Sequence, residues 1–239
     1  MLIIHEIKNN KTITEQDIWE LSFYIRQTYE RTTMVVIDGY FASEDVFRSD
    51  DHGCLETISF NAADPKHMEF ANNSLGQNLQ LMHQATCHSD PKAFILANNS
   101  MSNGPYNGGM NDYLEETVGP CMAVDLLNMS CQMEIDMDSQ MLYRLLLHYF
   151  AIVKLAFGGF DNAPDIYLWW DKLLMLGVVH EHFTFRDLTL LSGYKTERAV
   201  RNLASPSTPE NRRVSVIKVG RQTLITQDEV LRWLKANAK

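Results

Sequence analysis

The sequence contains no run of about 18 uncharged apolar residues, which is the minimum for a membrane-spanning helix. Its most apolar segment, residues 141–157, is interrupted by Arg144, His148 and Lys154. The apolar run at the start of the chain ends at His5, which makes it too short for a secretory signal peptide. We therefore expect neither a membrane span nor export.

Cysteine is also scarce, with four residues that lie far apart in the 239-residue chain: Cys54, Cys87, Cys121 and Cys131. An even number of cysteines does not by itself imply disulfides, and the sequence shows no export signal. We expect four reduced thiols in a cytoplasmic protein. With 45% hydrophobic and 21% charged residues, the chain should be globular and able to bury a substantial core.

Patterns that mark catalytic or metal sites are few. Three candidates can be named: His180-Glu181-His182, Cys87-His88, and the pair Asp136 and Asp138. The two histidines could bind a metal ion only if they lay on a strand and other parts of the chain supplied further ligands. The Cys-His pair lacks partners at metal-ligand spacing. The two aspartates are typical of a helix start. No phosphate-binding loop or nucleophile elbow is present. We expect no enzyme, no metal and no cofactor.

Charge is divided unevenly along the chain, whose net charge is −9. Residues 183–239 contain 11 Lys and Arg against 5 Asp and Glu, a net of +6, so residues 1–182 carry a net of −15. The division coincides with a change in sequence pattern, and it predicts two modules with different partners. A solvated basic tail is the alternative, but the regular pattern of the basic segment argues against it.

The basic segment begins with two predicted helices joined by a turn. Thr184 followed by Asp187 predicts a capped helix start, and Gly193 ends that helix because glycine tolerates the left-handed conformation. Thr196 predicts the cap of a second helix that runs to about Ala204. The faces of this second helix separate by type, with Ala199, Val200 and Leu203 inside and Arg198, Arg201 and Asn202 outside. Such a pair of helices is typical of a helix-turn-helix, whose second helix enters the major groove.

A polar loop over 205–213 follows, and then two predicted strands, 214–219 and 223–225, around Gly220. The β-branched residues and the glycine turn predict a β-hairpin.

The last predicted helix begins at a capping box formed by Thr226 and Glu229. Its apolar face is expected to hold Val230, Leu231 and Leu234, with Trp233 beside them. The basic segment therefore reads as helix, turn, helix, hairpin and helix.

This order resembles the excisionase-like and MerR-like winged-helix family over residues 183–235, about a quarter of the chain. The motifs that carry the resemblance are the first helix from Thr184 to Gly193, the second helix Thr196-Glu-Arg-Ala-Val-Arg201, the turn Val219-Gly-Arg221, and the ending Ile225-Thr-Gln-Asp-Glu-Val-Leu-Arg-Trp-Leu234. The chain departs from the family in its longer, proline-bearing loop over 205–213. The resemblance therefore does not determine the path of the hairpin, which is the wing of such a domain, or which groove of DNA it would contact.

The resemblance implies that residues 183–239 form a DNA-binding domain. Residues expected near bases are Lys195, Thr196, Arg198, Arg201 and Asn202, and those expected on phosphates or in the minor groove are Arg212, Arg213, Lys218 and Arg221. Arginine can pair with the two acceptors of guanine, and asparagine with adenine. The alternative for each arginine is a solvated surface position.

Residues 1–182 are predicted to be mostly helical, which makes the whole chain mainly α with minor β. Two helices are predicted to begin after Thr14 and at Pro65, and three more are predicted over 112–127, 139–157 and 165–177. Short strands are predicted over 34–37 and 54–60, and a long loop over 98–111. Residues 1–182 would serve for dimerisation or for sensing a signal.

The sequence as a whole predicts a sequence-specific DNA-binding protein of the bacterial or phage transcriptional-regulator type. It would bind double-stranded DNA as a homodimer and could receive a protein or small-molecule effector at its acidic part. Two alternatives stay open. One is a protein-interaction module that uses the winged-helix segment without DNA, and the other is an enzyme in the acidic part.

Overall fold

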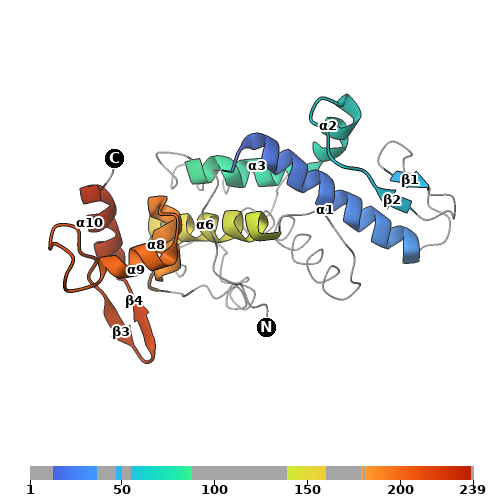
Figure 1. Cartoon of the computed structure of the whole chain (residues 1–239). Coiled ribbons are helices and arrows are strands. Elements are labelled where there is room, and N and C mark those ends of the chain that lie inside the picture. Colours follow the sequence, from blue (N-terminus) through green and yellow to red (C-terminus); the bar gives the residue numbers. More distant parts are fainter. Residues whose placement is uncertain are drawn as a thin grey trace. The chain divides into compact units, whose positions relative to one another are not determined.

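A computed structural model describes residues 13–36, 47–49, 55–87, 139–159, 179 and 181–237 of the chain (Figure 1). These residues are mainly helical, as the sequence predicted, and they include two small antiparallel sheets, of which only the second was predicted as a hairpin. None of the helices in these ranges combines the length and the apolarity needed to cross a membrane. Several predicted features lie outside the described residues. They are the loop 98–111, the helices 112–127 and 165–177, and the residues Cys54, His88, Cys121, Cys131, Asp136, Asp138 and His180.

The chain divides into two compact units. Of the described residues, the N-terminal unit holds 13–84 and 139–142, and the C-terminal unit holds 85–87, 143–159, 179 and 181–237. The C-terminal unit thus includes most of a helix that lies outside the range 183–239. The assignment of DNA binding to residues 183–239, and of dimerisation or sensing to residues 1–182, stays a prediction.

Among the described residues, the N-terminal unit contains α1 (Glu15–Val36), β1 (Phe47–Ser49), β2 (Leu55–Thr57), α2 (Pro65–Ala71) and most of α3 (Ser74–Cys87). The strands pair antiparallel, with Ser49 opposite Leu55. Helix α1 runs through Val36, so the strand predicted over 34–37 is wrong for 34–36. The predicted strand 54–60 is shorter than expected, and the helical stretch from Pro65 breaks into two helices.

Gly76 permits a close approach between α3 and its neighbours. A Cβ atom at this position would lie 2.2 Å from the carbonyl oxygen of Ala71 and 2.6 Å from the Ser22 hydroxyl. The same two groups are joined by a hydrogen bond of 2.7 Å, donated by Ser22 Oγ. A glycine inside a helix is therefore explained by packing, because any side chain would separate α3 from α1 and α2.

The C-terminal unit has the element order predicted for its last part: α6 (Ser139–Phe157), α8 (Phe185–Ser192), α9 (Glu197–Leu203), β3 (Ile217–Val219), β4 (Gln222–Leu224) and α10 (Gln227–Asn237). The two strands pair antiparallel around Gly220, whose φ of 58° is left-handed. They are shorter than predicted.

Local capping signals explain where α8 begins and ends and where α9 begins. Thr184 and Asp187 form the predicted reciprocal capping box at the start of α8, and Gly193 ends it with a φ of 69°. Thr196 accepts a hydrogen bond from the amide of Ala199 and caps α9. The turn between the two helices is thus specified at both of its ends.

The core of the C-terminal unit gathers side chains from α8, α9 and α10 and from the segments that flank these helices and the hairpin: Phe183, Phe185, Leu188, Val200, Val214, Ile225, Val230 and Trp233. Phe183 and Ile225 also exchange two backbone hydrogen bonds of 2.8 Å. On α10 the prediction is partly wrong, because Trp233 is buried and Leu231 is 46% exposed. Burying the indole removes more apolar surface from water than burying a leucine does.

Helix α6 is fixed to α8 through a fully buried lysine. Lys154 Nζ lies 3.0 Å from Asp187 Oδ2 and donates to the carbonyl oxygens of Val179 (3.1 Å) and His182 (2.7 Å). It also lies 4.5 Å from the centre of the Phe183 ring. Since Asp187 belongs to the capping box of α8, one carboxylate both starts that helix and holds the ammonium of α6.

We expect Lys154→Met to lower the free energy of unfolding by about 3–5 kcal/mol, because it leaves the Asp187 carboxylate buried without a counter-charge. The measurement is urea unfolding of the full chain followed by circular dichroism. Lys235→Met is the matched control, since Lys235 is exposed on α10. A loss no larger than that of the control would contradict the structural role of the pair.

Candidate nucleic-acid interface

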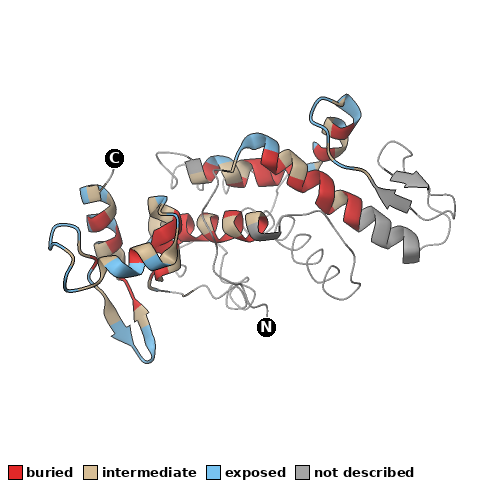
Figure 2. Ribbon diagram, viewed as in Figure 1, coloured by how far each residue is buried: buried red, intermediate tan, exposed pale blue. Residues whose placement is uncertain are grey.

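Helix α9 presents a polar face to solvent. Much of its ribbon is coloured as exposed in Figure 2. Arg198, Arg201 and Asn202 are all exposed, whereas Val200 on the opposite side is fully buried. The separation follows from helical geometry, because Val200 anchors the helix in the core and leaves its neighbours outside. The outer face predicted from sequence is therefore present.

The two arginines of this face are not equally free. Arg201 forms an ion pair with Glu197 one turn earlier, and its guanidinium lies 5.4 Å from the centre of the Phe185 ring. The side chain of Arg198 makes no hydrogen bond or ion pair within the described part of the chain. Arg198 can therefore approach a ligand directly, whereas Arg201 must first leave Glu197.

The β3–β4 hairpin carries two further cations, Lys218 and Arg221. Both are exposed, and Lys218 donates a hydrogen bond to the hydroxyl of Thr223 on the paired strand. Arg221 follows Gly220 at the turn, and its side chain has no polar partner among the described residues. The tip of the hairpin therefore offers a free guanidinium.

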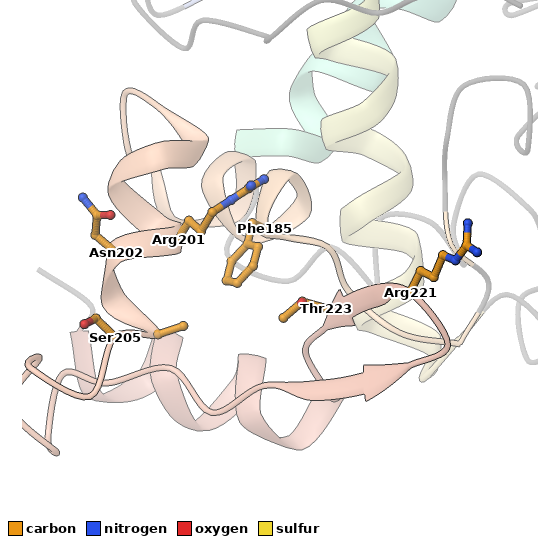
Figure 3. Close-up of a pocket in the computed structure, with 7 residues that line it drawn as sticks. Phe185, Arg201, Asn202, Ser205, Arg221 and Thr223 are labelled. Atoms are coloured by element: carbon orange, nitrogen blue, oxygen red, sulfur yellow. The ribbon is translucent and has the colours of Figure 1, made fainter.

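A hollow of about 480 Å³ lies between α9 and the hairpin (Figure 3). It is lined by Phe185, Arg201, Asn202, Ala204, Ser205, Arg221 and Thr223. Phe185 lies between the side chains of Arg201 and Thr223 (Figure 3). The hollow brings three of the predicted site residues together, and two of these are cations. Sequence reasoning missed Phe185, Ser205 and Thr223, because nothing in a helix start, a loop or a strand indicates that they share one cavity.

Helix α10 holds the chain segment that leads into the hairpin. The Trp233 indole donates to the carbonyl oxygen of Arg212 (2.8 Å), and Arg232 donates to the carbonyl oxygen of Arg213 (2.9 Å). Glu229 accepts a hydrogen bond of 2.7 Å from the amide of Ser215. The predicted capping box is thus only half formed, because the Glu229 carboxylate is used to position the hairpin.

Glu229 is also paired with Arg232 by two hydrogen bonds of 2.6 Å. These bonds, together with the Ser215 amide, hold the pKa of the Glu229 carboxyl below its usual value. The folded state therefore favours the charged carboxylate.

The predicted contact residue Arg213 closes the long loop over 205–213. Its guanidinium donates to the carbonyl oxygens of Thr208 (3.0 and 2.8 Å) and Pro206 (2.7 Å). Thr208 in turn donates to the carbonyl oxygen of Asn202 at the end of α9. The proline-bearing loop is thus folded back on itself by one arginine, which is half-buried.

The remaining predicted site residues lie elsewhere. Thr196 is the cap of α9, and its hydroxyl accepts the Ala199 amide. Lys195 and Arg212 line a second hollow, which shares no residue with the one in Figure 3. The structure therefore divides the predicted cations between two surfaces.

The described residues contain no group of three His, Cys, Asp or Glu side chains that could hold a metal ion. Of the predicted histidine pair, His182 lies in the C-terminal unit, where its carbonyl oxygen accepts from Lys154.

No family model, curated protein or solved structure matches the chain. The interpretation of this surface therefore depends on its geometry: exposed cations on one helix and one hairpin, with a polar hollow between them.

We expect Arg213→Ala to lower the free energy of unfolding by about 1–2 kcal/mol, because three carbonyl hydrogen bonds to a charged donor are lost. Amide hydrogen exchange should quicken over 205–213. Arg212→Ala is the matched control, since its exposed side chain makes no such bond, and it should change stability by less than about 0.5 kcal/mol. Equal effects of the two changes would contradict the role of Arg213 in the loop.

We expect Glu229→Gln to destabilise the protein at neutral pH by about 1 kcal/mol. The lowered pKa of Glu229 means that its contribution is present above the ordinary value of 4.5 and is lost as the pH falls through the folded value. The gap between variant and wild type should therefore narrow below about pH 4.5 in urea unfolding series. Asp228→Asn, at the exposed neighbouring position, serves as control; a gap that widens in acid would contradict the assignment.

Proposed function

We propose that the protein is a sequence-specific DNA-binding protein and that residues 183–237 form a winged helix-turn-helix. In this proposal α9 is the recognition helix and the β3–β4 hairpin is the wing. The observation that carries the proposal is the hollow between these two elements, which is lined by Arg201 and Asn202 from one side and Arg221 from the other.

The chemistry of the exposed side chains suits DNA. Arg198 is free to donate two hydrogen bonds to guanine, and Asn202 can pair with adenine in the major groove. Lys218 and Arg221 on the hairpin suit phosphates or the minor groove, where their charge adds affinity without reading sequence. The net charge of +6 on residues 183–239 favours the same ligand.

The proposal extends to assembly and regulation. One small module makes few base contacts, so two copies bound to paired half-sites would increase both affinity and specificity. The acidic part of the chain, with its net charge of −15, would lie away from the phosphates and would serve dimerisation or signal input. The protein would then act as a transcriptional regulator in the cytoplasm.

The test is fluorescence anisotropy of the full chain on mixed genomic DNA fragments over a salt series. We expect affinity to fall steeply with salt, and Arg198→Ala/Arg201→Ala to bind at least about 10-fold more weakly, because each arginine pair with guanine is worth about 1–3 kcal/mol. Lys235→Ala, on the exposed end of α10, should bind as the wild type does.

A second double variant separates charge from base reading. Arg198→Lys/Arg201→Lys keeps both charges but loses the forked donors, so it should retain the salt dependence while losing preference among selected sequences. If the full chain shows no salt-dependent DNA binding, or if the alanine variant binds as the wild type does, the DNA proposal is wrong.

A further inference from the structure

A second hollow, of about 840 Å³, lies between the α8–α9 turn and helix α10. The residues that line it include Leu191, Tyr194, Lys195, Arg212, Trp233 and Leu234, together with small or polar residues of the turn and the end of α10. It shares no residue with the hollow beside the hairpin, so the proposed DNA-binding surface does not account for it.

The floor of this hollow is apolar and aromatic. Tyr194 and Trp233 lie with their ring centres 5.9 Å apart, and Leu191 and Leu234 pack against the same core. The Trp233 side chain is only 2% exposed, and its only polar atom is bonded to the carbonyl oxygen of Arg212, so the indole backs the hollow. The apolar surface open to a ligand comes from the partly exposed Leu191, Tyr194 and Leu234. Leu231, which is 46% exposed, lies one helical turn before Leu234 and extends the apolar strip along α10.

Two cations border this apolar floor. Lys195 lies in the turn before α9, and Arg212 lies at the end of the loop over 205–213. Both are exposed, and neither side chain makes a hydrogen bond or an ion pair with the residues that the structure describes. The surface therefore combines exposed apolar area with two uncompensated positive charges.

We propose that this hollow binds an acidic amphipathic segment of a partner protein, with apolar side chains on the Tyr194–Leu234 floor and carboxylates at Lys195 and Arg212. An amphipathic helix placed in an apolar groove is a recurrent mode of peptide recognition, and flanking charges of opposite sign fix its register. The proposal goes beyond DNA binding and does not depend on it.

The apolar floor argues against DNA as the occupant, because phosphates and sugars would leave the exposed parts of Leu191, Tyr194 and Leu234 without apolar contacts. A symmetric dimer through this surface would bring together two copies of a patch that carries Lys195 and Arg212 and no acidic lining residue, and like charges repel. A head-to-tail contact between copies would continue into an open polymer unless its rotation closed a ring. A different, acidic chain satisfies both the floor and the cations.

The test begins with a phage-displayed library of random peptides about 16 residues long, enough for four helical turns, selected on the full-length protein. Enriched sequences should combine Asp or Glu with Leu or aromatic residues at spacings of three and four. Synthetic, fluorescein-labelled versions are then titrated with the full-length protein and its variants.

Two double charge reversals give the decisive comparison. Lys195→Glu/Arg212→Glu should weaken peptide binding at least about 10-fold, whereas Lys218→Glu/Arg221→Glu, the same charge change on the hairpin, should leave it within about twofold. Leu231→Ser should weaken it by a smaller factor, through the apolar strip alone. Circular dichroism establishes that each variant is folded.

Three results would overturn the proposal: no enrichment, enriched peptides without acidic residues, or equal binding to the two charge-reversal variants. If Lys195→Glu/Arg212→Glu instead abolishes DNA binding while no peptide distinguishes it from wild type, these cations are phosphate contacts and the partner site does not exist. If the full chain binds no DNA but the peptide comparison gives the expected result, the DNA proposal fails and the partner site stands.

Discussion

The buried ion pair between Lys154 and Asp187 is the contact on which the C-terminal unit depends. A lysine ammonium without water needs partners for each of its three protons, and here two carbonyl oxygens and one carboxylate supply them. Because the same carboxylate caps α8, the start of that helix, the carbonyls of Val179 and His182, and the position of α6 are determined together. The exposed face of α9 is thus held by a core that extends well before residue 183.

Much of this unit could be predicted from sequence because its signals are local. Thr184, Gly193 and Thr196 each act within a few residues, and the structure has the predicted caps and the turn between them. Lys154 shows the limit of such reasoning. Its charge looks like an interruption of an apolar helix, and nothing nearby in sequence indicates that its partner lies 33 residues further on.

The candidate site was predictable only in part, because it too depends on contacts between residues that are far apart in the sequence. Exposure of Arg198, Arg201 and Asn202 follows from helical periodicity, but the separation of Lys195 and Arg212 from them depends on where α10 packs. Arg213 directly follows Arg212 in the sequence, yet its side chain does not face the second hollow, because it forms hydrogen bonds to carbonyl oxygens within the loop. Tertiary packing decides which of several similar cations faces which ligand, and composition cannot rank them. The choice of Trp233 over Leu231 for the core is a second case in which packing overrides a simple apolar stripe.

The ion pair between Glu197 and Arg201 means that a ligand of the α9 face competes with Glu197 for the Arg201 guanidinium. An anion that attracts Arg201 must displace a carboxylate from the same helix, and it then lies near that displaced negative charge. A diffuse negative surface gains little from this exchange, because attraction to one group is offset by repulsion from the other. A ligand that gives the guanidinium two well-placed acceptors gains more than it loses. An exposed pair of this kind is worth about 0.3–0.5 kcal/mol, so its acidic member gives the α9 face a small bias toward ligands with well-placed acceptors.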